Sequence, residues 1–133
     1  MEKIIISSDN APKTTGPFSQ AVLCSADYNL ELSGQIGINP ESGKLVEGGI
    51  TAETEQTLSN IEAILAEAGW GFENVVKARI YLADMNDYAT VNEIYAKKFT
   101  QNPPARIALA VKSLPLGALV EIECVAVGEK VIS

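Results

Sequence analysis

Two side chains in this sequence are best suited to chemistry: an arginine and a glutamate. Arg106 directly follows Pro103-Pro104-Ala105, and its planar guanidinium can hold a carboxylate through two parallel hydrogen bonds. Glu123 lies deep in the last predicted strand, where Val125 and Val127 continue its face, so its carboxylate needs a partner or a bound water. Each also has a simpler interpretation, since most arginines pair with surface acids in solvent and a half-buried glutamate commonly forms an ion pair. Taken alone, Arg106 is a candidate for binding a carboxylate and Glu123 is a half-buried acid, and the two residues do not identify a reaction.

Two glycine-containing segments could shape a pocket near them. Gly34 interrupts a predicted strand within Ser33-Gly34-Gln35, which indicates either a bulge or the close approach of a ligand or another backbone. The segment 16–20 is either a pocket-lining turn or the entry of a loop. Glu121 precedes Glu123 by two residues on the same face and is typical of the solvent side of a half-buried strand.

Composition excludes several classes of protein. The 133 residues contain no histidine, which excludes a Ser-His-Asp triad, a Cys-His pair and any histidine-ligated metal site. The formal net charge of −7 argues against a nucleic-acid binder. Cys24 and Cys124 form no metal motif, and we expect both to be small buried hydrophobic residues. No apolar window approaches the ~18 residues of a membrane span and the first residues do not resemble a signal peptide, so we expect a cytoplasmic protein.

These residues must be positioned by one domain, which we expect to span residues 1–133. Alternating or β-branched runs predict strands at about 4–6, 18–24, 28–38, 74–82, 106–112 and 119–127, with Asp27 in a hairpin turn between the second and third. Helical spacing predicts one helix from an N-cap at Thr51 to Gly69, with Glu53 at its positive end. A second helix is predicted from about Asn86 to the prolines at 103–104.

The order β-β-β-α-β-α-β-β predicts an α+β fold with a single mixed sheet and two helices packed on one face. The apolar stripes that would cover the sheet are, on the first helix, Leu58, Ile61, Leu65 and Ala68, and on the second, Tyr88, Val91, Tyr95 and Phe99.

Four separated blocks of the chain resemble the RidA family, also called the YjgF or L-PSP family. The blocks are Gly16-Pro17-Phe18-Ser19-Gln20-Ala21, Ser33-Gly34-Gln35-Ile36, Asn102-Pro103-Pro104-Ala105-Arg106 and Leu114-Pro115-x-Gly117-x-x-Val120-Glu121-Ile122-Glu123. The resemblance runs from about Lys3 to Val127 in the family's order and spacing.

The resemblance implies a chorismate-mutase-like fold that assembles as a homotrimer, with ligand sites in the clefts between subunits. Members hydrolyse 2-imino acids, such as 2-iminobutanoate and 2-iminopropanoate, to 2-oxo acids and ammonia, with neither cofactor nor metal. By position, Arg106 would bind the substrate carboxylate and Glu123 would position or activate water. Ser33, Gly34, Asn92 and Phe18 would line the cleft.

The sequence departs from the family pattern at two positions. Many members carry tyrosine where this chain has Phe18, and cysteine where it has Ala108. Two other functions stay open beside the deaminase. One is a binding module that senses a small carboxylate metabolite without turnover, and the other is a ribonuclease or translation inhibitor, which the acidic charge and missing histidines argue against.

Overall fold

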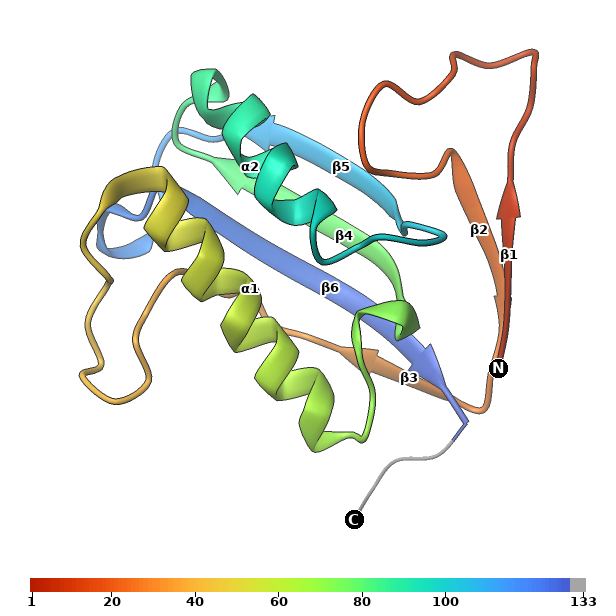
Figure 1. The fold of residues 1–133 in the computed structure, drawn as a ribbon, viewed down its shortest axis with the longest axis horizontal. Coiled ribbons are helices and arrows are strands. Elements are labelled where there is room, and N and C mark those ends of the chain that lie inside the picture. Colours follow the sequence, from red (N-terminus) through yellow and green to blue (C-terminus); the bar gives the residue numbers. More distant parts are fainter. Residues whose placement is uncertain (130–133) are drawn as a thin grey trace.

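In the computed structural model, which describes residues 1–129, two α-helices pack on one face of a mixed sheet (Figure 1). The sheet has the order β3-β6-β4-β5, formed by Tyr28–Glu31, Val120–Gly128, Val75–Leu82 and Ala105–Ala110. Strand β6 is antiparallel to both neighbours, whereas β4 and β5 are parallel and are joined through helix α2 (Tyr88–Ala96). Helix α1 (Gly49–Glu67) lies beside α2. The α+β class and the predicted order of elements are confirmed.

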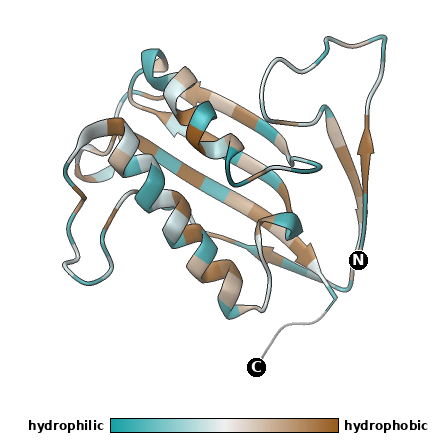
Figure 2. Cartoon of the chain, viewed as in Figure 1, coloured by the Kyte–Doolittle hydropathy of each residue, from teal (hydrophilic) through white to brown (hydrophobic). Residues whose placement is uncertain are grey.

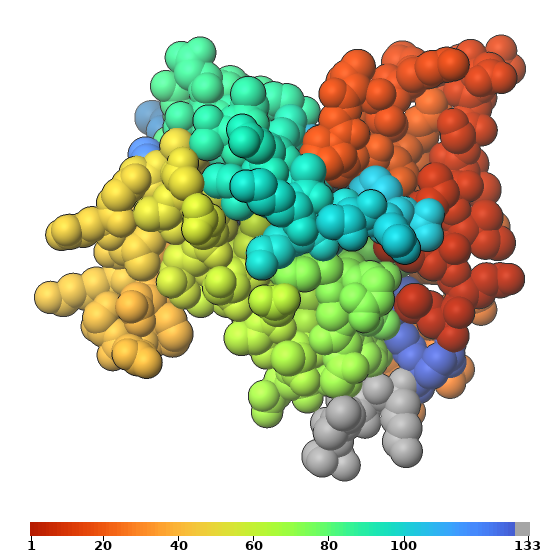
Figure 3. All heavy atoms as spheres, in the orientation of Figure 1, coloured from red at the N-terminus to blue at the C-terminus, as the bar shows by residue number. Residues whose placement is uncertain are grey.

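The N-terminal strands form a separate two-stranded sheet, so the prediction of one sheet containing every strand is wrong for these two. Strand β1 (Glu2–Ile6) pairs antiparallel with β2 (Ala21–Ser25), and β3 pairs with β6. The predicted hairpin around Asp27 is therefore wrong, because the strands on either side of it have other partners. In the space-filling view these N-terminal residues form one side of the molecule, next to the segment near residue 100 (Figure 3).

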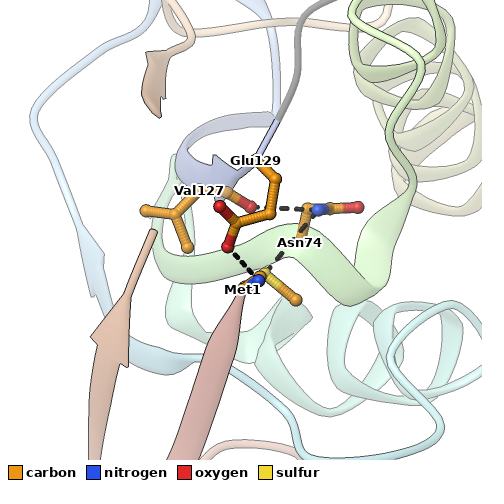
Figure 4. A network of polar contacts seen from close by, with 4 residues as sticks. All are labelled: Met1, Asn74, Val127 and Glu129. Carbon is orange, nitrogen blue, oxygen red and sulfur yellow. Dashed lines mark hydrogen bonds and ion pairs between the residues drawn. The ribbon is translucent and has the colours of Figure 1, made fainter. Parts of the chain in front are cut away.

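Polar contacts hold the β1–β2 pair to the main sheet at the end that carries Glu2 and Ser25. The Lys3 ammonium donates hydrogen bonds to the carbonyls of Glu73 (3.3 Å) and Val75 (2.9 Å), and burial lowers the pKa of Lys3. The Met1 amine pairs with the Glu129 carboxylate, while the Asn74 amide donates to the Val127 carbonyl at 2.9 Å (Figure 4). The contacts of Lys3 and Met1 attach the N-terminal end of the chain to the start of β4 and to the residue after β6.

The core lies between the helices and the sheet, where the apolar residues of both layers meet (Figure 2). Its fully buried side chains include Leu58, Ile61, Leu65, Ile80, Val91, Tyr95, Val120 and Ile122. Both predicted helix stripes are buried apart from Tyr88, which is partly exposed. Of the two cysteines, Cys124 is buried as predicted, but Cys24 is exposed because it lies on the small N-terminal hairpin, which no helix covers.

The predicted boundaries of α1 are right at one end and wrong at the other. The helix begins at Gly49 after Gly48, whose φ of 117° suits glycine, so Thr51 is inside the helix and is not its N-cap. At the other end the Gly69 N–H bonds the Ala66 carbonyl, the Trp70 N–H bonds the Leu65 carbonyl, and Gly69 has a φ of 78°. This pair of bonds is a Schellman motif, and it confirms Gly69 as the helix stop.

Glu53 is buried in the first turns of α1 rather than exposed at a helix end. Its side chain is 4% accessible, and its Oε1 accepts the Leu119 N–H at 2.8 Å. A Cβ at Gly37 would lie 2.9 Å from the Glu53 backbone, so the loop after β3 packs tightly on the same turn. Glu53 thus fixes the start of β6 and the loop from β3 against one helix.

We expect Glu53→Ala to lower the free energy of unfolding by about 1–3 kcal/mol, because the part-buried Leu119 N–H would lose its acceptor. Glu53→Gln is the matched control, since its amide oxygen can still accept that bond and the loss should be smaller. Urea denaturation measures both variants. Equal stability of Glu53→Ala and the wild type would contradict the role given to this carboxylate.

Candidate active site

Arg106 lies in a box of aromatic rings. Its Cζ is 4.9 Å from the centroid of Phe18, 5.7 Å from that of Tyr88 and 5.0 Å from that of Tyr95. Phe18 comes from the loop before β2, while both tyrosines come from α2. Ring faces stabilise a guanidinium by cation–π attraction, worth about 0.5–2 kcal/mol each. The arginine is thus not the solvated strand end with an acidic partner that its sequence position alone favours.

Some N–H groups of the Arg106 guanidinium have no hydrogen-bond partner among the described residues. Nη2 donates a hydrogen bond to the Tyr88 hydroxyl at 3.0 Å, but Nη1 is buried and has no partner among the described residues. The Asn92 Oδ1 and the Tyr95 hydroxyl are also buried without a partner there. Tyr88, Asn92 and Tyr95 share one side of α2 through their i, i+4, i+7 spacing. Burial raises the pKa of Tyr95, so its phenol stays neutral.

Ser19 fixes Phe18 relative to Arg106. Its hydroxyl donates to the Pro103 carbonyl, and its N–H donates to the Pro104 carbonyl at 3.2 Å. Residues 19 and 105 also form a parallel bridge, so the loop that carries Phe18 is joined to the segment that leads into β5. The box is therefore assembled by one side-chain and one main-chain hydrogen bond between parts of the chain more than eighty residues apart.

Glu123 has the partner that its surroundings require. The Tyr81 hydroxyl donates to Glu123 Oε1, and Arg79 Nη1 lies 4.0 Å from Oε2. The hydrogen bond to the carboxylate raises the pKa of Tyr81. The prediction that this carboxylate is paired is confirmed.

Glu121 rather than Glu123 contacts the predicted cleft residues. A Cβ at Gly34 would overlap the Glu121 carboxylate, so this glycine allows the close approach of a side chain rather than of a ligand or another backbone. The pairing with β6 shifts by one residue between Glu31↔Val125 and Gln35↔Ile122, which agrees with the predicted bulge. Strand β3 ends at Glu31, short of the predicted residue 38, and beyond it Gln35 forms an isolated bridge with Ile122. That bridge holds Gly34 beside β6. Within residues 1–129 Glu121 has no hydrogen bond or ion pair, in contrast to Glu123.

Arg106 and the two glutamates lie on opposite faces of the sheet. Arg106 is in register with Ala78 and Cys124, which face the helices, whereas Glu123 is in register with Arg79 on the uncovered face. Gly34 and Arg106 are also near opposite edges, three strand spacings or roughly 14 Å apart. One chain therefore has two groups of predicted site residues. The first joins Phe18, Asn92 and Arg106, and the second joins Ser33, Gly34, Glu121 and Glu123.

Sequence reasoning missed Tyr88, Tyr95 and Glu121. Both tyrosines were assigned to an apolar helix stripe. Their rings do pack with the core, but the assignment gives no role to their hydroxyls. A signal was present, since a buried tyrosine needs a partner for its hydroxyl and a nearby strand begins with an unpaired arginine. For Glu121 the strand pattern alone gives no signal, because the contact with Gly34 depends on how the chain folds after β3.

An α+β chain whose strand-borne arginine is enclosed by aromatic rings matches a known class of protein. A family model described as "Endoribonuclease L-PSP" matches residues 8–128. The 2-iminobutanoate/2-iminopropanoate deaminase of Homo sapiens is 51% identical over 123 residues, covering 92% of this chain and 88% of that one. The chain belongs to the L-PSP family, which includes the Rid proteins, and this confirms the resemblance seen in the sequence.

Solved structures agree with this assignment. RidA from an Antarctic Psychrobacter is 39% identical with a TM-score of 0.73, covering 93% of this chain and 98% of that one. A protein of the conserved Rid family from Yersinia pestis is 28% identical with a TM-score of 0.86, covering 96% and 99%. Among the described residues, no helix is long and apolar enough to cross a membrane, and no cluster of three or more Cys, Asp or Glu side chains could hold a metal.

Proposed function

We propose that this protein hydrolyses small 2-imino acids to 2-oxo acids and ammonia. The observation that carries the proposal is the Arg106 guanidinium, which is enclosed by three rings and has a buried Nη1 without a partner in residues 1–129. Such a group suits the planar carboxylate of a small organic acid, which can accept two parallel N–H bonds. The deaminase named among the relatives, 51% identical, acts on substrates of this kind by its name.

The reaction asks little of the protein beyond orientation. Water adds to the imine carbon to give a carbinolamine, which then breaks its C–N bond, releases ammonia and leaves the 2-oxo acid. Imines already hydrolyse in water, so a group that binds the substrate carboxylate and one general acid–base are sufficient. We therefore propose that the reaction needs no cofactor and no metal ion.

A carboxylate of β6 would position and activate the water. Glu123 is the residue that the resemblance implies, but it already holds the Tyr81 hydroxyl and lies near Arg79. Both contacts engage its carboxylate oxygens within the chain, which leaves less of the group for a water. Glu121 has neither partner and lies against Gly34. These contacts support Glu121 as the stronger of the two candidates for the base.

We further propose that the complete site forms between subunits of a homotrimer. Arg106 faces the helices while Glu121 and Glu123 lie on the uncovered face, so a second copy would have to bring a glutamate to the arginine. Apolar side chains also remain exposed on this molecule: Ile4, Ile6, Leu23 and Ile107 are all more than 40% accessible. A subunit interface would bury such residues. The number three comes from the resemblance to the family.

The other functions make different demands on the same residues. A module that only binds carboxylates would use Arg106 but release no ammonia from freshly generated 2-iminobutanoate above the uncatalysed rate. A ribonuclease would need basic residues along a phosphate backbone, and the net charge of −7 argues against it. Measuring ammonia release, together with RNA binding at low salt, separates the three.

We expect sedimentation equilibrium to give about three times the monomer mass at micromolar concentration. The exposed apolar residues and the divided site both support a partner subunit. A stable monomer would contradict the trimer and the intersubunit site together.

Arg106→Lys should damage turnover nearly as much as Arg106→Ala. Lysine keeps the charge but not the two-pronged geometry, so the loss of one charge-assisted bond costs ~1.5–3 kcal/mol, about ten- to a hundredfold in kcat/KM. KM should rise and kcat fall in both variants, and Arg106→Lys, which keeps a cation among the rings, should lower the melting temperature less than Arg106→Ala. If Arg106→Lys kept a kcat/KM near that of the wild type, a positive charge alone would be sufficient for activity and the two-pronged grip would be wrong.

Glu121→Gln should lower kcat at least tenfold while 2-oxobutanoate still binds, because the amide keeps the shape of the side chain but cannot act as a base. Glu123→Gln is the matched comparison, with the same chemical change on the same strand and face. If only Glu123→Gln were inactive, Glu123 rather than Glu121 would be the base that activates the water.

A further inference from the structure

We propose that Tyr88 is a positioning residue that sets the orientation of the Arg106 guanidinium through its hydroxyl. The inference rests on the proposed function, in which Arg106 grips a carboxylate. Neither the sequence pattern nor the resemblance assigns Tyr88 a part in the site.

The aromatic box alone does not fix which way the guanidinium fork points. The rings of Phe18, Tyr88 and Tyr95 hold Arg106 by their faces, at 4.9, 5.7 and 5.0 Å from Cζ. Attraction to a ring face depends on the position of the cation more than on rotation within its own plane. A bidentate grip requires the rotation to be fixed as well, since its two N–H groups must point at the two carboxylate oxygens.

The hydrogen bond to the Tyr88 hydroxyl fixes the rotation of the guanidinium within its own plane. Its 3.0 Å contact with Nη2 is the only hydrogen bond that Arg106 side-chain atoms make within residues 1–129. It uses one of the two Nη2 hydrogens and leaves the other, together with those of Nη1, for a ligand.

Tyr88 is itself held firmly enough for this role. It is the first residue of α2, directly after a short 3-10 turn formed by Met85–Asp87. The Asp84 carboxylate accepts the Asn86 N–H at 2.9 Å and caps that turn. At position 18 the facing ring is a phenylalanine, which has no hydroxyl, so the phenol of Tyr88 is the directional group of the box.

Tyr88→Phe tests the inference because it keeps the ring and removes only the hydroxyl. Titration calorimetry with 2-oxobutanoate should show a Kd raised about five- to twentyfold, with the melting temperature nearly unchanged. KM for 2-iminobutanoate should rise by a similar factor. Tyr28→Phe is the matched control on the exposed strand β3 and should bind like the wild type.

A double variant shows whether Tyr88 acts through Arg106. In the Arg106→Lys background, Tyr88→Phe should change the Kd less than twofold, because the fork that it orients is gone. A full effect in that background, an unchanged Kd for Tyr88→Phe alone, or a wild type that binds no 2-oxobutanoate would overturn the inference. Failure of the proposed deaminase is a different result. The wild type would then release no ammonia from 2-iminobutanoate, while the calorimetry on Tyr88→Phe would still decide the role of the hydroxyl.

Discussion

The alternation of side chains along β6 is the constraint on which the rest of this structure depends. Its even-numbered residues, such as Ile122 and Cys124, are buried under the helices, while Glu121 and Glu123 are on the other face. A one-residue slip would put carboxylates into the core, so the register is strongly specified. Because β6 pairs with both β3 and β4, it also fixes the places of the remaining strands.

The same alternation explains why the site is divided. Arg106 is on β5 in the row that faces the helices, so it can be enclosed by aromatic residues of α2. The glutamates of β6 are in the opposite row, where no helix covers them. A protein that needs an arginine and a carboxylate around one small ligand can meet this geometry by assembling copies. This is the physical reason for proposing a site between subunits.

Burial of charge distinguishes the groups that hold the fold from those available to a ligand. Glu53 is buried and accepts a main-chain N–H, which makes it part of the scaffold. Glu123 has a tyrosine and an arginine nearby, so its charge is compensated inside the chain. Arg106 has ring faces and one hydroxyl, which leaves much of its hydrogen-bonding capacity unused. An incompletely paired buried charge is costly unless a ligand completes it.

The sequence alone determined the class of fold, the order of elements and the core stripes, because these follow from local periodicity and residue chemistry. It did not determine the pairing of β2 with β1, the exposure of Cys24 or the true start of α1 at Gly49. Pairing of the N-terminal strands depends on contacts between distant segments, such as those of Lys3 with the carbonyls of Glu73 and Val75. The contact of Glu121 with Gly34 and the bond from Arg106 to Tyr88 also arise only once the chain is packed, since no spacing rule links those residues.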